Sequence, residues 1–183
     1  MTVPSPEDAF LFDLSRAYAG ERTALQILEQ GAGEVVDERA GAVLTRHAEE
    51  TRAQLRGLEQ VFSLFDAQPQ ALSCPALEGI RHELDLFRQQ DPAPELLTVT
   101  TLFANLKIEH NEIATYGSLI DKAVLLGQLE AARILTMIAE QDEETAATIG
   151  RLIHELLLEM VRDSGSATEI AAAGGRAAPH ATS

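Results

Sequence analysis

The chain of 183 residues is long enough for one domain with a sizeable core, and its composition, 45% hydrophobic but only 4% aromatic, suits closely packed helices. Its formal net charge of −15 argues against nucleic acid and anionic membranes as partners, because both repel an acidic protein. The sequence shows no apolar run of the roughly 18 residues that cross a membrane and no signal-peptide pattern at its N-terminus. Its single cysteine, Cys74, excludes an intramolecular disulfide. We therefore expect a cytoplasmic protein.

Apolar residues that recur at helical spacing predict two long helices in the first part of the chain. The first is expected from about residue 6 to 30, with Ser5 as its N-cap. The glycines of "GAG" at 31–33 are expected to end it. The second is expected to begin near Glu34 or Asp37 and to continue to about residue 66.

A shorter helix and two long helices are predicted in the rest of the chain. The shorter one is expected over about 75–90, and the long ones over about 95–126 and 128–162 with Gly127 near their joint. No strand pattern competes with them, so the sequence predicts an all-α, ferritin-like four-helix bundle in which the short helix is a crossover between two hairpins. We interpret residues 1–6 as a leader, residues 7–163 as the bundle and residues 164–183 as a small, polar and disordered tail.

Each long helix carries an acidic residue near its middle, on or at the edge of the face that its apolar residues mark as buried. These residues are Glu21, Glu50, Glu109 and Asp142, and His47 and Glu112 lie at the edges of the same faces. Any one of them alone has an ordinary explanation, such as an acid paired inside the core or a residue that flanks the buried face. Their presence on all four long helices calls for a common explanation.

Together the inward acids predict a metal site. Burial of an ionised carboxylate costs several kcal/mol, and no Lys or Arg is expected at the same depth to neutralise these four. Either the acids are protonated or cations lie among them. Two divalent ions would balance four carboxylates, and oxygen ligands with some imidazole suit iron or manganese. We expect Glu21, Glu50, Glu109 and Asp142 as metal ligands, His47 and Glu112 as further candidate ligands, His110 and Gln54 as supports for the ligands, and Tyr116 as a core tyrosine or a donor to a ligand.

Four blocks of sequence resemble the YciE/YciF-type ferritin-like family, in the same order and with similar spacing, over roughly residues 8–155. They are "HAEETRAQLRGLEQVF" (47–62), "CPALEGIRHE" (74–83), "KIEHNEIATYGSL" (107–119) and "LGQLEAARIL" (126–135). The resemblance implies a dimeric ferritin-like bundle with a di-metal site, in a family tied to stress responses. Carried over by position, it points to Glu21, to His47 and Glu50, and to Glu109 and Glu112.

Two positions depart from the family pattern. Asn111 stands where the family usually has Tyr, and Gln141 and Asp142 stand where it tends to have a pair of Glu residues. Asp142 keeps the charge but is one methylene shorter, and Gln141 loses a charge. The site is therefore expected to hold one metal firmly and a second weakly, or none.

Two functional hypotheses follow. The first is a di-iron or di-manganese protein, expected as a homodimer, that acts in an oxidative or general stress response through iron chemistry or through oxygen or peroxide as substrate. The alternative is a non-enzymatic, acidic helical bundle that acts as a stress or interaction protein with a structural or vestigial metal site. Metal content discriminates between them, and the sequence leaves open whether the protein is an enzyme.

Overall fold

The computed structural model describes residues 3–163, which form five α-helices and no strand. The helices are α1 (Pro6–Glu34), α2 (Glu38–Leu64), α3 (Pro75–Arg88), α4 (Pro94–Leu125) and α5 (Leu129–Asp163). The prediction of an all-α fold is confirmed. The tail expected at 164–183 lies outside the described residues, and the division into leader, bundle and tail stays a prediction. No helix among the described residues has both the length and the hydropathy needed to span a bilayer.

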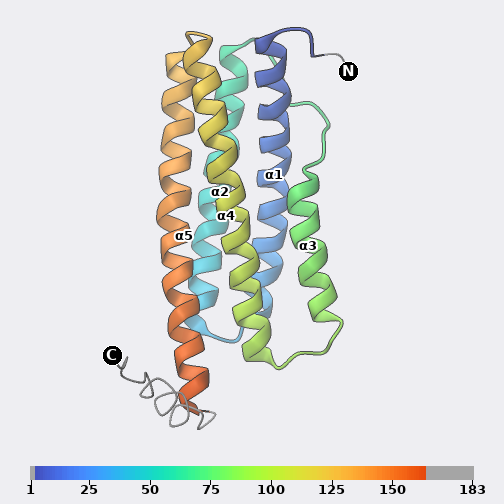
Figure 1. The fold of residues 1–183 in the computed structure, drawn as a ribbon, viewed down its shortest axis with the longest axis vertical. Coiled ribbons are helices and arrows are strands. Elements are labelled where there is room, and N and C mark those ends of the chain that lie inside the picture. Colours follow the sequence, from blue (N-terminus) through green and yellow to red (C-terminus); the bar gives the residue numbers. More distant parts are fainter. Residues whose placement is uncertain (1–2, 164–183) are drawn as a thin grey trace, which may run out of the picture.

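The four long helices form a bundle, and α3 lies on its outside (Figure 1). One hairpin consists of α1 and α2, and the other of α4 and α5. The hairpins meet through α1 against α4 and α2 against α5, while α3 packs on α1 and α4. The connection from α2 to α4 runs along the bundle and contains α3 (Figure 1), so α3 is the predicted crossover helix.

Side-chain caps place the beginnings of α1 and α2. Ser5 Oγ accepts a hydrogen bond from the Asp8 backbone N–H at 3.1 Å. Asp37 Oδ1 accepts from the backbone N–H groups of Arg39 and Ala40 at 2.9 and 3.1 Å. Such bonds satisfy N–H groups that have no partner within the helix. Of the two start signals considered for the second helix, Asp37 is therefore the one that the structure uses.

The prediction that "GAG" at 31–33 ends the first helix is wrong, because α1 continues to Glu34. Gly31 is buried where α1 approaches α4, and a Cβ built at this position would lie 2.8 Å from Thr101 Cγ2. A Cβ at Gly33 would meet nothing within 4 Å. Gly31 therefore permits close packing of two helices and does not reverse the chain. Among the glycines of residues 3–163, the one with a positive φ is Gly127, at +74°, in the joint between α4 and α5.

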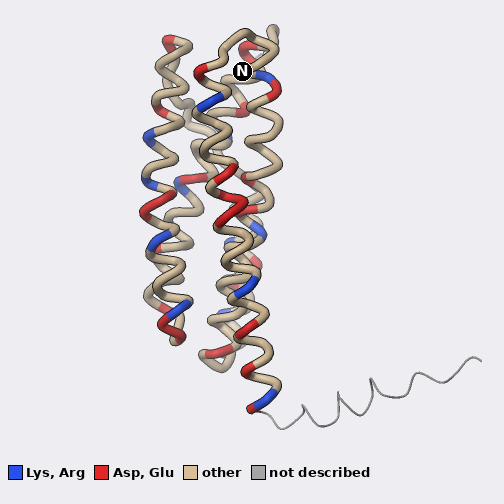
Figure 2. Tube along the Cα trace, turned by 90° about the vertical axis from the view of Figure 1, so that its left-hand side faces the viewer, with Lys and Arg blue, Asp and Glu red and all other residues tan. Residues whose placement is uncertain are grey.

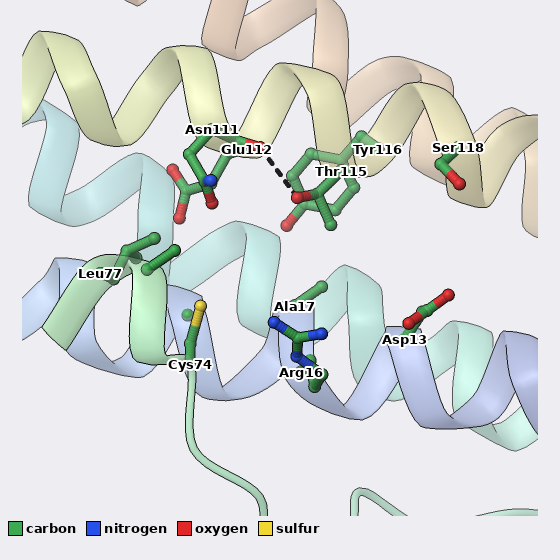
Figure 3. Close-up of a pocket in the computed structure, with 12 residues that line it drawn as sticks. Asp13, Arg16, Ala17, Cys74, Leu77, Asn111, Glu112, Thr115, Tyr116 and Ser118 are labelled. Carbon is green, nitrogen blue, oxygen red and sulfur yellow. Dashed lines mark hydrogen bonds between the residues drawn. The ribbon is translucent and has the colours of Figure 1, made fainter. Parts of the chain in front are cut away.

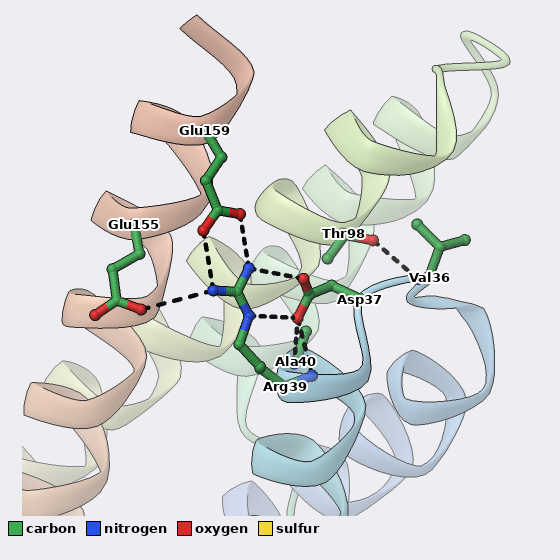
Figure 4. A network of polar contacts seen from close by, with 7 residues as sticks. All are labelled: Val36, Asp37, Arg39, Ala40, Thr98, Glu155 and Glu159. Atoms are coloured by element: carbon green, nitrogen blue, oxygen red, sulfur yellow. Dashed lines mark hydrogen bonds and ion pairs between the residues drawn. The ribbon is translucent and has the colours of Figure 1, made fainter. Parts of the chain in front are cut away.

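A surface network joins the two hairpins at the end of the bundle where α2 begins (Figure 4). Arg39 donates to Asp37 Oδ2 at 2.9 Å and to Glu159 Oε2 on α5 at 2.7 Å. The Val36 backbone N–H donates to Thr98 Oγ1 on α4 at 3.1 Å. The Arg39 side chain is 46% exposed, so water and salt screen its ion pairs and the network mainly fixes geometry.

Two hydrophobic clusters fill the ends of the bundle. One contains Phe10, Phe62 and Leu135, and the other contains Leu28 and Leu102. Between the two clusters lies a polar layer to which every long helix contributes. Its buried residues are Glu21, His47, Thr51, Gln54, Glu109, Glu112, Asp142 and Thr145. Outside the core, Lys and Arg positions are scattered along the helices among the Asp and Glu positions, which outnumber them (Figure 2).

Candidate metal centre

Four buried carboxylates from three helices meet in the polar layer. Glu21 comes from α1, Glu109 and Glu112 from α4, and Asp142 from α5, and none is more than 6% exposed. One oxygen from each of Glu109, Glu112 and Asp142 lies within 4.8 Å of the other two. Residues three apart on a helix are neighbours on its surface, which is how α4 contributes two acids. We call these four residues the acid cluster.

Three members of the acid cluster each contact one side chain that orients a carboxylate oxygen. The Tyr116 hydroxyl donates to Glu21 Oε1, and Gln54 Nε2 donates to Asp142 Oδ1 at 2.6 Å. His47 Nε2 lies 2.9 Å from Glu109 Oε1. The predictions that Gln54 supports a candidate ligand and that Tyr116 donates to one agree with these contacts.

Each acid of the cluster also has an oxygen that receives no hydrogen bond within residues 3–163. These atoms are Glu21 Oε2, both carboxylate oxygens of Glu109, Glu112 Oε1 and Asp142 Oδ2. The buried side chains of the described residues include no Lys or Arg. A buried polar atom without a partner costs about 1–3 kcal/mol, and more if charged, so native proteins rarely contain four together. The arrangement leaves five acceptor oxygens available to a bound cation or to protons.

Burial and mutual repulsion raise the pKa values of Glu21, Glu112 and Asp142. Burial and then the nearby Glu109 raise the pKa of Glu21 to about 7, against the lowering effect of the hydrogen bond from Tyr116. Burial, followed by Glu21 and Glu109, raises the pKa of Asp142 to about 9. The same causes, with burial first, hold the pKa of Glu112 well above its ordinary value. Without a cation, the acid cluster therefore retains protons at neutral pH.

Helix α2 contributes an imidazole and an amide to the layer, with its acid at the rim. Burial lowers the pKa of His47, but its contact with Glu109 and the charges of Glu21 and Glu50 outweigh burial, so the pKa is raised. The Glu50 side chain is 21% exposed and lies 3.4 Å from Arg46. The sequence placed Glu50 at the edge of the buried face, and the structure shows it there.

One prediction from the sequence is wrong for a residue near the acid cluster, and three other residues there were overlooked. His110 is exposed, so the expectation that it supports a ligand is wrong. Sequence reasoning missed three buried polar residues next to candidate ligands, namely Thr51, Asn105 and Thr145. Each lies three or four residues from a candidate ligand on its own helix, so it occupies the neighbouring turn. That spacing is the signal that would have found them.

A cavity of about 230 Å³ between α1, α3 and α4 extends to the acid cluster (Figure 3). Arg16 lines it from α1, Cys74 from the residue before α3, and Asn111, Glu112 and Tyr116 from α4. Glu112 is the member of the acid cluster that reaches its wall.

Comparison with known proteins identifies the family. A family model described as a domain of unknown function, DUF892, matches residues 5–162. The chain belongs to this family. Among curated proteins it is similar to YciF of Escherichia coli strain K12, with 30% identity over 146 residues that cover 79% of this chain and 88% of that protein. The resemblance to YciF-type proteins expected from the sequence is therefore confirmed.

Solved structures agree with the DUF892 assignment. The crystal structure of the E. coli stress protein YciF matches with a TM-score of 0.80 and 27% identity, and covers 84% of this chain and 98% of that chain. YcfI from Rhodopseudomonas palustris matches with a TM-score of 0.77 and 28% identity over 81% of this chain and 94% of that chain. A two-domain protein from Anabaena variabilis with a ferritin-like domain matches with a TM-score of 0.58 and 15% identity, over 98% of this chain and 41% of that chain. The ferritin-like four-helix fold is confirmed.

The donors of this DUF892 protein fit a metal ion. Carboxylate oxygens with an imidazole suit divalent transition metals, and inward carboxylates on several helices are how ferritin-like bundles hold metals. The Glu-x-x-His pairs usual in such bundles are not present here: the chain has Glu109-x-x-Glu112 on α4 and the reversed order His47-x-x-Glu50 on α2. The buried acidic group is compatible with metal binding in general, and the choice of metal belongs to the proposal that follows.

Proposed function

We propose that this protein binds two divalent metal ions, iron or manganese, in the acid cluster and acts in a stress response through oxygen, peroxide or iron chemistry. The observation that carries the proposal is that each of the four buried carboxylates has at least one oxygen that receives no hydrogen bond within residues 3–163. Two divalent cations would balance the charge of the four acids. The description of the similar E. coli YciF as a stress protein supports the physiological part.

In this proposal each residue of the layer has a role. Glu21, Glu109, Glu112 and Asp142 hold the metals, while His47 and Glu50 are the further candidate ligands from α2. Bound iron or manganese would supply electrons for the reduction of oxygen or peroxide. Tyr116 keeps its proton against Glu21 Oε1, and Gln54 directs its N–H at Asp142 Oδ1, so both hold carboxylates in place. The hydrophobic clusters on both sides of the layer keep bulk water from reaching it through the ends of the bundle.

A second candidate function is the metal-free acidic bundle. The raised pKa values of Glu21 and Asp142, about 7 and about 9, favour it, because protons can neutralise the acids in place of metals. Gln141 stands where the family tends to have a Glu, and its Oε1 accepts a hydrogen bond from Gln54 Nε2 at 3.3 Å. A neutral contact between two amides therefore takes the place of a candidate acidic ligand. In this case the protein would act through its surface.

Metal content per chain separates the two candidates. The protein is purified without chelators from cells supplied with iron and manganese, and its metals are counted by mass spectrometry. Glu109→Ala removes a ligand, and Glu143→Ala removes the same charge from an exposed position on α5. We expect about two metals per chain in the wild type and in Glu143→Ala and fewer than one in Glu109→Ala. A folded wild type without metal would refute the proposal and leave the metal-free bundle.

We also propose that the protein is a cytoplasmic homodimer. Leu96 and Phe103, seven residues apart on α4, are 45% and 49% exposed, and Leu86 on α3 is 46% exposed, which leaves apolar surface for a second copy. Light scattering on the wild type and on Phe103→Asp tests this. A wild type with the mass of one chain would contradict the dimer.

A further inference from the structure

The cavity between α1, α3 and α4 joins the acid cluster to the protein surface. Exposed residues form its mouth, among them Arg16 on α1, Ala76 on α3 and Ser118 on α4. At its inner end lies Glu112, which is 6% exposed and whose Oε1 receives no hydrogen bond within residues 3–163. A buried carboxylate with a free acceptor oxygen therefore lines a space that opens to solvent (Figure 3).

The size of the cavity suits a hydrated cation. Six waters of roughly 30 Å³ each occupy about 180 Å³, and the cavity holds about 230 Å³. Its wall carries neutral oxygen donors from Asn111 and Thr115. These groups can replace waters as the ion loses its hydration shell, a step that divalent cations undergo reluctantly without substitute ligands.

A second cavity, between α2 and α5, approaches the same layer but presents a different surface. It measures about 280 Å³ and is lined by Gln54, Arg56, Arg133 and Met137, with no carboxylate. Gln54 directs its amide N–H at Asp142. No carboxylate lines this cavity to receive a cation that loses its waters, so it is a poor entrance.

We propose that the cavity between α1, α3 and α4 is the passage by which a hydrated divalent cation enters the acid cluster, with Glu112 as its first buried ligand. This inference rests on the proposed function and adds the route of entry to it. Asp13 on the wall is held by Lys122, with Nζ 2.5 Å from Oδ2. Arg16 at the mouth makes no ion pair with any described residue, and its positive charge opposes the entry of a cation.

The experiment measures the rate at which the chelator-treated full chain takes up Co²⁺, followed by the absorption of the bound ion in a stopped-flow instrument. Ala76→Trp places an indole at the mouth of the proposed passage. Its matched control is Ala53→Trp, at an exposed position that lines the cavity between α2 and α5. Ser118→Trp places an indole at the same mouth from α4. It provides a second test of the passage if Ala76→Trp does not fold. All variants are checked for a wild-type melting temperature.

We expect both mouth variants to take up Co²⁺ at least tenfold more slowly than the wild type while they reach the same final stoichiometry. Ala53→Trp should stay within twofold of the wild-type rate. Wild-type rates in both mouth variants, or an equal slowing in Ala53→Trp, would overturn the passage and leave the proposed function intact. A wild type that takes up no Co²⁺ would overturn the proposed function and the passage with it.

Removal of Arg16 gives a test in the opposite direction. Arg16→Ala should take up Co²⁺ severalfold faster than the wild type at low ionic strength, and the difference should shrink in 0.5 M salt, because salt screens the charge. Arg22→Ala, which removes the same charge from an exposed position on α1 outside the cavity lining, should leave the rate unchanged. Equal Co²⁺ uptake rates in the wild type, Arg16→Ala and Arg22→Ala would show that the Arg16 charge does not act on the entering cation.

Discussion

The acid cluster should make the chelator-treated protein less stable as the pH rises from acidic to neutral. The pKa of Glu21 is about 7 in the folded chain, against the ordinary 4.5 that applies when the chain unfolds. Between these values the folded state holds a proton that the unfolded state has lost, so the free energy of unfolding falls as the pH increases. The stabilisation that comes from the Glu21 proton is complete below about pH 4.5. It decreases as the pH rises to about 7 and is absent at higher pH.

The size of this effect follows from the pKa shift. From pH 5.5 to 7, Glu21 alone lowers the free energy of unfolding by about 2 kcal/mol, since one pKa unit corresponds to about 1.4 kcal/mol. For a chain of this length that is about 4–8 °C in melting temperature. Asp142, with a pKa of about 9, extends the decline above pH 7. His47, whose pKa is raised, acts in the same direction, because its stabilising proton is lost as the pH rises through its folded-state pKa.

Melting temperatures by circular dichroism at pH 5.5, 7.0 and 8.5 measure the effect, in chelator and with excess Mn²⁺. Glu21→Gln should flatten the decline in chelator, and the exposed Glu143→Gln should not. Because protons and metals compete for the same oxygens, Mn²⁺ should raise the melting temperature more at pH 8.5 than at pH 5.5. A wild-type melting temperature in chelator that stays constant or rises from pH 5.5 to 8.5 would refute the reasoning.

Two further outcomes test the packing around the layer. Tyr116→Phe removes the only hydrogen bond that the described residues give to Glu21 and should lower the free energy of unfolding by about 1–3 kcal/mol in urea denaturation; an unchanged midpoint would show that Glu21 finds another partner. Gly31→Ala should destabilise the protein, because its Cβ would lie 2.8 Å from Thr101 Cγ2, whereas Gly33→Ala should stabilise it by about 0.5–1 kcal/mol. Equal melting temperatures for the two alanine variants would contradict the close approach of α1 to α4.

The helices and the bundle could be predicted because their signals are local. Apolar spacing located five helices, and Ser5 and Gly127 marked an end and a joint that the structure confirms. The error at residues 31–33 arose because Gly31 is needed for a tertiary contact between two helices and does not end α1. Nothing near Gly31 in the sequence indicates that Thr101, seventy residues later, will lie against it. Local glycine signals cannot separate a helix end from a close approach between helices.

The burial of a candidate ligand was predictable where the acid lies at the centre of a buried face, as Glu21, Glu109 and Asp142 do. At the edges of the faces the sequence treats Glu50 and Glu112 much alike, yet the structure separates them: Glu112 is 6% exposed, and the Glu50 side chain is 21% exposed. The difference comes from which neighbours cover each helix, and that depends on how the whole chain packs.

The position of α3 explains why the two edge acids differ. This helix packs on α1 and α4. Cys74, the residue before α3, and Leu77 in its first turn line the cavity next to Glu112. Because α3 covers part of α4, a wider face of α4 is buried, and Glu112 at the edge of that face is buried with it. No helix among the described residues covers α2 in the same way, so Glu50 stays at the rim beside Arg46. The crossover helix thus recruits Glu112 into the acid cluster and also forms one wall of the passage that leads to it.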